Sequence, residues 1–326
     1  MKYRPYRLNM EKIVKLIRRH GMTKLPKSRD IKTLKTAMSW TYQKSPAKLG
    51  NMEAVIHAEE LNWLNTGKIV YFPESLDMAQ NIMRGAYSIT TEEALYDGDE
   101  SFILNLPDGL SFDNSSKGSG LIVTIMKHVD RRDVIDSFTD WVGVDRANVE
   151  TTGEQGNFTI AINYQNVFNS DEYLRVAFPS QNALKFLQMK DLDDYVKSMT
   201  DKNAFNYNNG FLLDKKEYAY QFEMIRLVCG FLVYKKALPE RIVSGLPGIN
   251  HKEVDTPLTK GQDHKIIKSP RGTREITGGY RTWHFRQLRD KRFYQGEHKN
   301  KVAGSRIIFV SESYIADDVD AKTVEG

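Results

Sequence analysis

Four short apolar runs in the middle of the chain limit its fold more than any other feature of the sequence. In one of them, Phe158, Ile160 and Ile162 alternate with smaller or polar residues, as in a strand with one covered face. Another ends at Pro107-Asp108-Gly109, whose residues favour a turn. We therefore expect a mostly antiparallel sheet built from residues 101–107, 121–126, 158–164 and 173–178.

Helical patterns flank these runs, so the sequence indicates an α+β fold. Ser180 is the expected N-cap of the helix that begins there. Residues 251–279 lack periodicity and are expected to form a surface loop or strap, followed by a final strand at residues 306–310 and a frayed acidic end. Helices are expected at residues 8–20, 31–42 and 52–64, from residue 75 onward, and at residues 180–199 and 216–237.

Three regions follow from these patterns. Residues 1–97 form a basic helical region, and residues 98–250 form an α+β core with a mostly antiparallel sheet and packed helices. Residues 251–326 form a basic aromatic strap with the final strand, which we expect to pack into one compact unit with the core.

The charge is distributed unevenly along the chain. Residues 1–49 carry 14 basic and 2 acidic side chains, and residues 251–306 carry 14 basic and 6 acidic ones, although the whole chain is only +5. The remaining residues are therefore acidic overall. Basic ends of this kind attract RNA, DNA or an acidic protein surface, and the acidic middle of the same chain is a competing partner for them.

The only cysteine, Cys229, lies in an apolar run, which excludes an internal disulfide and fits a reducing compartment. The first residues lack the apolar stretch of a secretory signal. The most apolar segment, residues 218–234, contains Gln221, Glu223 and Arg226 and is too short and too polar for a membrane span. We therefore expect a cytoplasmic protein without a membrane partner.

Residues 278–294 interleave arginine with aromatic side chains. If this segment is extended, Arg281, Trp283 and Phe285 share one face, and His284 and Arg286 share the other. Guanidinium groups and rings bind phosphates, stack on bases and anchor protein interfaces. In the competing interpretation, the rings belong to the core and the arginines form a solvated rim.

The candidate binding residues form two groups. The main surface is expected near the carboxyl end, and a secondary basic surface is expected on the first helix, whose charged face could also be merely solvated. The main group comprises Arg281, Trp283, His284, Arg286, Arg289, Arg292, Tyr294, His298 and Lys299. The secondary group comprises Lys12, Lys15, Arg18 and Arg19.

Catalytic and metal-binding patterns are weak. The histidines fit no zinc spacing, so we expect no metal and no cofactor. Pro107-Asp108 and Glu297-His298-Lys299 contain the residue types of a restriction-type nuclease, but they are far apart in sequence. Lys117-Gly118-Ser119-Gly120 precedes a strand and is more typical of a hairpin turn than of a phosphate-binding loop. We therefore expect a protein that is not an enzyme.

Several of these segments resemble a phage-encoded anti-CRISPR family, the type V-A inhibitor that suppresses biogenesis of the effector nuclease. The resemblance spans residues 75–312 in outline, and the apolar run at residues 101–108 and the basic aromatic tail carry it most closely. Gly85-Ala86-Tyr87 precedes that run, and Leu227-Val228-Cys229 resembles a Leu-x-Cys step in a late apolar helix of the family.

The resemblance implies a protein that recognises a nascent polypeptide, or a ribosome-associated complex, in the cytoplasm of an infected bacterial host. It further implies that binding promotes loss of the translated mRNA. Two other functions remain open at this stage. One is a general RNA- or single-strand-binding protein, and the other is a metal-dependent ribonuclease. The sequence gives no oligomeric state.

Overall fold

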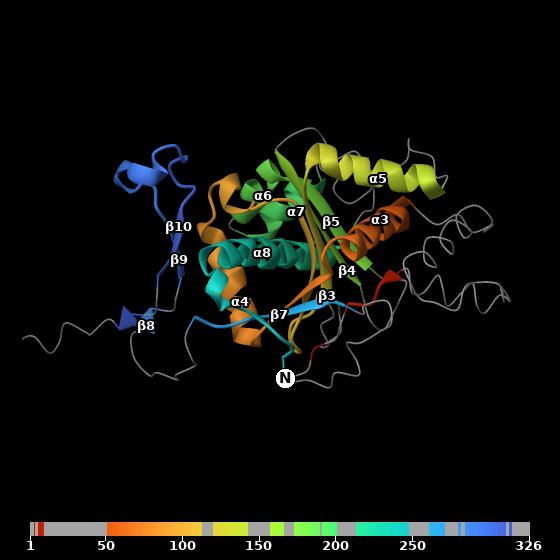
Figure 1. Cartoon of the computed structure of the whole chain (residues 1–326), viewed down its shortest axis with the longest axis horizontal. Helices are drawn as coiled ribbons and strands as arrows, with labels where there is room; N and C mark the ends of the chain where they lie inside the picture. The colour runs from red at the N-terminus through yellow and green to blue at the C-terminus, as the bar shows by residue number, and fades with distance from the viewer. Residues whose placement is uncertain are drawn as a thin grey trace, which may run out of the picture.

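The computed structural model describes residues 3, 6–9, 51–112, 120–142, 157–165, 173–189, 191–200, 213–247, 261–270, 280–281, 284–310 and 313–314. Within this part the protein has an α+β fold with six α-helices and a mixed sheet of seven strands (Figure 1). The helices are α3 (Asn51–Asn65), α4 (Leu76–Gly85), α5 (His128–Val142), α6 (Ser180–Leu187), α7 (Leu192–Thr200) and α8 (Lys215–Ala237).

The order of strands in the sheet is β5-β4-β3-β2-β1-β7-β6. The expected antiparallel arrangement is confirmed for most pairs, but β1 pairs in parallel with both β2 and β7. The strands are β1 (Ile69–Pro73), β2 (Glu100–Asn105), β3 (Gly120–Lys127), β4 (Phe158–Gln165), β5 (Tyr173–Pro179), β6 (Ile242–Ser244) and β7 (Asp263–Ile267). Chain segments from all three expected regions therefore contribute to one sheet.

Three sequence expectations need correction. Residues 263–267, expected in a loop, form β7, because β1 offers them a strand edge. The single helix expected at residues 180–199 is two helices, α6 and α7. Ser180 is the first residue of α6 and not its N-cap. Its buried hydroxyl donates a hydrogen bond to the carboxylate of Glu92 and accepts one from the amide of Asn157. The helices expected at residues 8–20 and 31–42 lie outside the described residues, apart from residues 8 and 9.

The large core lies between the sheet and α8, with α4, α6 and α7 beside α8 (Figure 1). The ring of Phe231 in α8 lies 4.8 Å from Tyr71 and 5.4 Å from Phe102, measured between centroids. A capping box of Asp214 and Glu217 starts α8. The expected helix at residues 216–237 is thus confirmed, and its rings bury enough apolar surface to hold the sheet beneath it.

The opposite face of the sheet is covered by α3 and α5 and carries polar side chains. The carboxylate of Glu59 in α3 lies 2.9 Å from Arg131 in α5 and 3.3 Å from Arg175 in β5, and it accepts a hydrogen bond from Asn163 in β4. Glu59 and both arginines are almost completely buried. Ionic bonds therefore join the two helices to the sheet beside buried apolar side chains of α3 such as Ile56 and Trp63. Both faces are covered, whereas the sequence indicated only one.

A small β-hairpin, separate from the seven-stranded sheet, extends from the main body and is coloured blue in Figure 1. Its strands are β9 (His284–Gln287) and β10 (Ile307–Val310), continued by the short pair β8 (Tyr280–Arg281) and β11 (Ser313–Tyr314). Five short 3-10 turns complete the part described here: η1 (Ala86–Ser88), η2 (Glu92–Ala94), η5 (Pro239–Arg241), η7 (Lys291–Phe293) and η8 (Gly296–His298).

Candidate functional site: the carboxy-terminal lobe and its groove

Residues 284–310, called here the carboxy-terminal lobe, contain most of the predicted binding residues. Phe285 fixes the lobe to the body, because its ring is only 3% exposed and lies 6.0 Å from the ring of Tyr234 in α8. Alternation along β9 then turns Arg286 outward, where it is exposed. The predicted two-faced geometry is therefore confirmed for Phe285 and Arg286.

The hydroxyl group of Tyr294 organises the connection between β9 and β10. It donates a hydrogen bond to the carbonyl of Leu288 at 2.6 Å and accepts bonds from the amides of Gly304 at 2.6 Å and Arg306 at 3.1 Å. These three bonds use the hydroxyl completely. Tyr294 therefore holds the lobe in shape, and its hydroxyl is not available to a partner, contrary to the contact role expected for it.

The other described candidates present their charges to solvent. Arg286, Arg289, Arg292 and Lys299 are exposed. Arg292 lies 3.5 Å from the carboxylate of Asp290, but both side chains are more than half exposed, so water weakens this pair.

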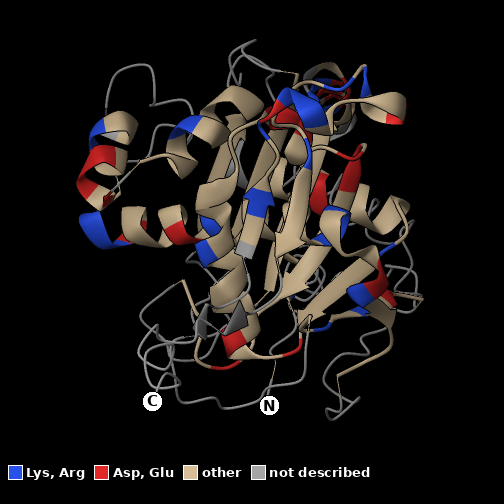
Figure 2. Cartoon of the chain, turned by 90° about the vertical axis from the view of Figure 1, so that its left-hand side faces the viewer, with Lys and Arg blue, Asp and Glu red and all other residues tan. Residues whose placement is uncertain are grey.

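The local excess of positive charge is large. The lobe contains seven Lys and Arg side chains and only two carboxylates. His298 is half-buried and contacts one of these carboxylates, Glu297, at 3.2 Å. Figure 2 views the chain from the side of the lobe, and in this view basic and acidic positions alternate along the ribbons of the helices. The lobe therefore carries a local cationic surface.

Several predicted residues cannot be placed on this surface. Trp283 lies outside the described residues, and so do Lys12, Lys15, Arg18 and Arg19. The strands containing Arg281 and His284 are described, but their side chains are not. The proposed convergence of the basic and aromatic side chains on one face therefore remains a prediction, and the buried ring of Phe285 fits the competing interpretation.

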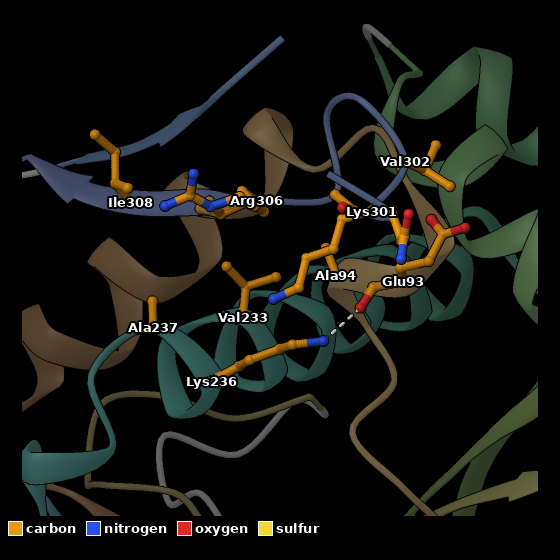
Figure 3. A pocket seen from close by; sticks show the side chains of 12 residues that line it. Glu93, Ala94, Val233, Lys236, Ala237, Lys301, Val302, Arg306 and Ile308 are labelled. Atoms are coloured by element: carbon orange, nitrogen blue, oxygen red, sulfur yellow. Dashed lines mark hydrogen bonds between the residues drawn. The ribbon is translucent and has the colours of Figure 1, made fainter. Parts of the chain in front are cut away.

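A groove of about 480 Å³ opens where the lobe meets the end of α8 and η2 (Figure 3). Apolar side chains, among them Val233 and Ala94, form its floor, and three cations stand around them. Its lining residues are Glu93, Ala94, Val233, Lys236, Ala237, Asn300, Lys301, Val302, Ser305, Arg306, Ile307 and Ile308.

Two of the three cations of the groove, Lys236 and Arg306, bond to backbone carbonyls. Lys236 donates to the carbonyls of Glu93 at 2.6 Å and Tyr96 at 3.0 Å, and Arg306 donates to the carbonyl of Phe293. Burial is the main cause that lowers the pKa of Lys236; the charge of Asp97 opposes this shift, and the nearby Lys301 adds to it. Within the described residues, neither lysine nor Arg306 has a carboxylate within 4 Å. Positive charge thus collects beside an apolar floor.

Sequence reasoning did not find this groove. Lys235-Lys236 at the end of an apolar helix is typical of side chains that stabilise the helix carboxyl end, so it gave no functional signal. Glu93, Lys236 and Lys301 are widely separated along the chain, and only the packing of the lobe on α8 brings them together.

The described residues also bear on the metal-binding and membrane expectations. Within them, no cluster of three or more His, Cys, Asp or Glu side chains is arranged to hold a metal ion. Glu297, one of the nuclease-like residues, is 85% exposed and contacts His298. None of the helices described has both the length and the apolar composition that a membrane crossing requires.

Comparison with known proteins identifies no relative. The chain matches no family model, no curated protein and no solved structure. The resemblance to the type V-A inhibitor family therefore remains a prediction from the sequence.

Proposed function

We propose that this chain is a macromolecule-binding protein that contacts a polypeptide through its carboxy-terminal lobe. The observation that carries the proposal is the groove, in which an apolar floor lies next to three cations that have no carboxylate within 4 Å among the described residues. Peptide side chains can fill an apolar floor and satisfy the cations at once, whereas a sugar-phosphate backbone satisfies only the charges.

The family resemblance specifies the polypeptide further. It implies a nascent chain or a ribosome-associated complex in an infected bacterial host, with loss of the translated mRNA as the outcome. In this proposal the chain itself catalyses no reaction, and mRNA loss follows from its binding to the translating complex.

Binding of RNA or single-stranded nucleic acid is the second candidate function. The exposed guanidinium groups of Arg286, Arg289 and Arg292 favour it, because arginine forks match phosphate oxygens and stack on bases. A nucleic-acid binder would lose affinity steeply with salt, in proportion to the phosphates that it neutralises. A peptide bound mainly on the apolar floor would lose much less.

The deciding experiment is crosslinking in expressing cells, followed by affinity recovery of the chain and analysis of the attached material. We expect nascent polypeptide with ribosomes to be recovered by the wild type and to be lost with Arg286→Ala plus Arg289→Ala. The matched control is Lys127→Ala plus Arg132→Ala, which removes two exposed cations outside the lobe.

Recovery of free RNA without ribosomes would support the second candidate and contradict the first. Degradation of RNA by the purified chain with added divalent metal would instead support the metal-dependent ribonuclease. Equal recovery by the lobe variant and the control would remove Arg286 and Arg289 from the contact surface.

A further inference from the structure

The edge of β10 adds a second feature to the groove. Within the described residues β10 pairs with β9 alone, and the amide of Leu288 donates to the carbonyl of Arg306 at 2.9 Å. In an antiparallel ladder, hydrogen-bonded pairs alternate with pairs that do not bond to each other. Because Leu288 bonds to Arg306, the next pair, Gln287 and Ile307, is one whose two residues do not bond to each other. The N–H and C=O of Ile307 therefore point away from β9.

The outer side of β10 is also the side of the groove. Four consecutive residues that lead into and form β10, Ser305 to Ile308, line the groove together with Val233 and Ala237 at the end of α8. The hydroxyl of Ser305 is buried and has no hydrogen-bond partner within the described residues. Backbone and side-chain polar groups without a partner among the described residues thus lie along one wall, and apolar side chains lie along the floor.

We propose, on the basis of the proposed function, that the groove binds an extended peptide segment. This segment adds a strand to the edge of β10, and its side chains alternate between carboxylates and apolar groups. Main-chain hydrogen bonds to an exposed strand edge give such complexes their affinity, and pockets for alternate side chains give specificity. The apolar side chains would rest on Val233 and Ala94, and the carboxylates would face Lys236, Lys301 and Arg306.

Charge complementarity selects the peptide class. Three cations and a single carboxylate, Glu93, line the groove, so a basic segment would be repelled. Figure 3 shows Lys236 and Lys301 extending over the floor from opposite sides, one from α8 and one from the lobe. A carboxylate placed between them would relieve the repulsion between the two amines.

The test uses synthetic octapeptides that alternate glutamate with valine, labelled for fluorescence anisotropy. Two isomers carry N-methyl groups on alternate residues, one set on the glutamates and the other on the valines. Only one set of amides can point at β10, so we expect one isomer to lose at least about tenfold in affinity and the other to bind like the parent. A peptide with lysine in place of glutamate should not bind.

The protein variants test the charges. Lys301→Glu, at an exposed groove position, should weaken binding by about tenfold, while Lys291→Glu, exposed in the same lobe but outside the groove, should change it by less than about twofold. Circular dichroism spectra of both variants should match the wild type, because both side chains are on the surface.

Four outcomes would overturn the proposal. They are a parent peptide that does not bind, equal behaviour of the two N-methyl isomers, displacement of the peptide by oligouridylate that depends on Lys301, and self-association in sedimentation that Lys301→Glu abolishes. The third result would assign the groove to RNA, and the fourth would assign it to a second copy of the chain.

The same variants separate this proposal from the proposed function. If Lys301→Glu still recovers nascent polypeptide from cells as well as the wild type does, the lobe remains a binding surface but the groove assignment is wrong. If the wild type recovers no polypeptide, the proposed function is wrong, while the peptide titrations still decide whether the groove binds an acidic strand.

Discussion

At Gly230 the helix α8 closely approaches Ile82 of α4, and replacing this glycine tests the packing of the large core. A Cβ at this position would lie 3.0 Å from both the carbonyl carbon and Cγ2 of Ile82, and closer still to the carbonyl oxygen. A backbone carbonyl has no alternative rotamer, so Gly230→Ala would push α8 away from α4. Contacts along the whole helix interface would loosen as a result.

Two effects of opposite sign determine the magnitude. Alanine is favoured over glycine inside a helix by about 1 kcal/mol. Overpacking a dense core costs about 1–3 kcal/mol, and a clash with main chain belongs at the upper end of that range. We therefore expect Gly230→Ala to lower the free energy of unfolding by about 2 kcal/mol, and Gly230→Val to lower it further because its side chain is larger.

The assay is urea unfolding followed by circular dichroism. The midpoint should fall for Gly230→Ala while the slope of free energy against urea stays unchanged. The reverse substitution Ala219→Gly, at a half-buried position of the same helix, calibrates the helix-propensity effect. A Gly230→Ala variant as stable as the wild type, or more stable, would refute the close approach of the two helices.

Three further predictions concern buried and half-buried polar groups. Glu59→Leu removes the carboxylate shared by Arg131 and Arg175, and urea unfolding should show a loss of about 3–5 kcal/mol; a loss below about 1 kcal/mol would contradict the role given to this ion pair. Burial raises the pKa of Glu223 in the folded protein. The stabilising contribution of this side chain is therefore present at low pH and is lost as pH rises through its folded-state pKa. Glu223→Gln should therefore unfold at higher urea than the wild type at neutral pH, with no advantage below about pH 4; an advantage independent of pH would argue against this cause. Tyr294→Phe removes three hydrogen bonds and should cost the lobe about 1–3 kcal/mol, seen as faster amide exchange at residues 288–306; unchanged exchange would show that other contacts hold the lobe.

Elements with strong local signals could be predicted from the sequence. The apolar helix α8 and strand β4 occur close to the expected residues, because helical and two-residue periodicities are encoded in neighbouring side chains. The outward direction of Arg286 also follows from alternation next to Phe285. In each case the information lies within one short segment.

Elements that depend on a partner were missed. The five residues of β1 lie between two helical patterns, and β7 begins with Asp263-His264-Lys265, which gives no apolar alternation. Neither segment would be stable as a strand alone, and they become strands because each supplies hydrogen bonds to the other. The helix α5 follows β3 directly and was likewise not expected.

The sequence by itself determined the fold class, the main strands and helices, and the concentration of positive charge near the carboxyl end. Only the tertiary structure decided that Glu59 joins two buried arginines and that Lys236 and Lys301 share a groove beside β10. The physical reason is that periodicity acts between near neighbours in the chain. Burial and charge pairing instead depend on side chains that folding alone brings together.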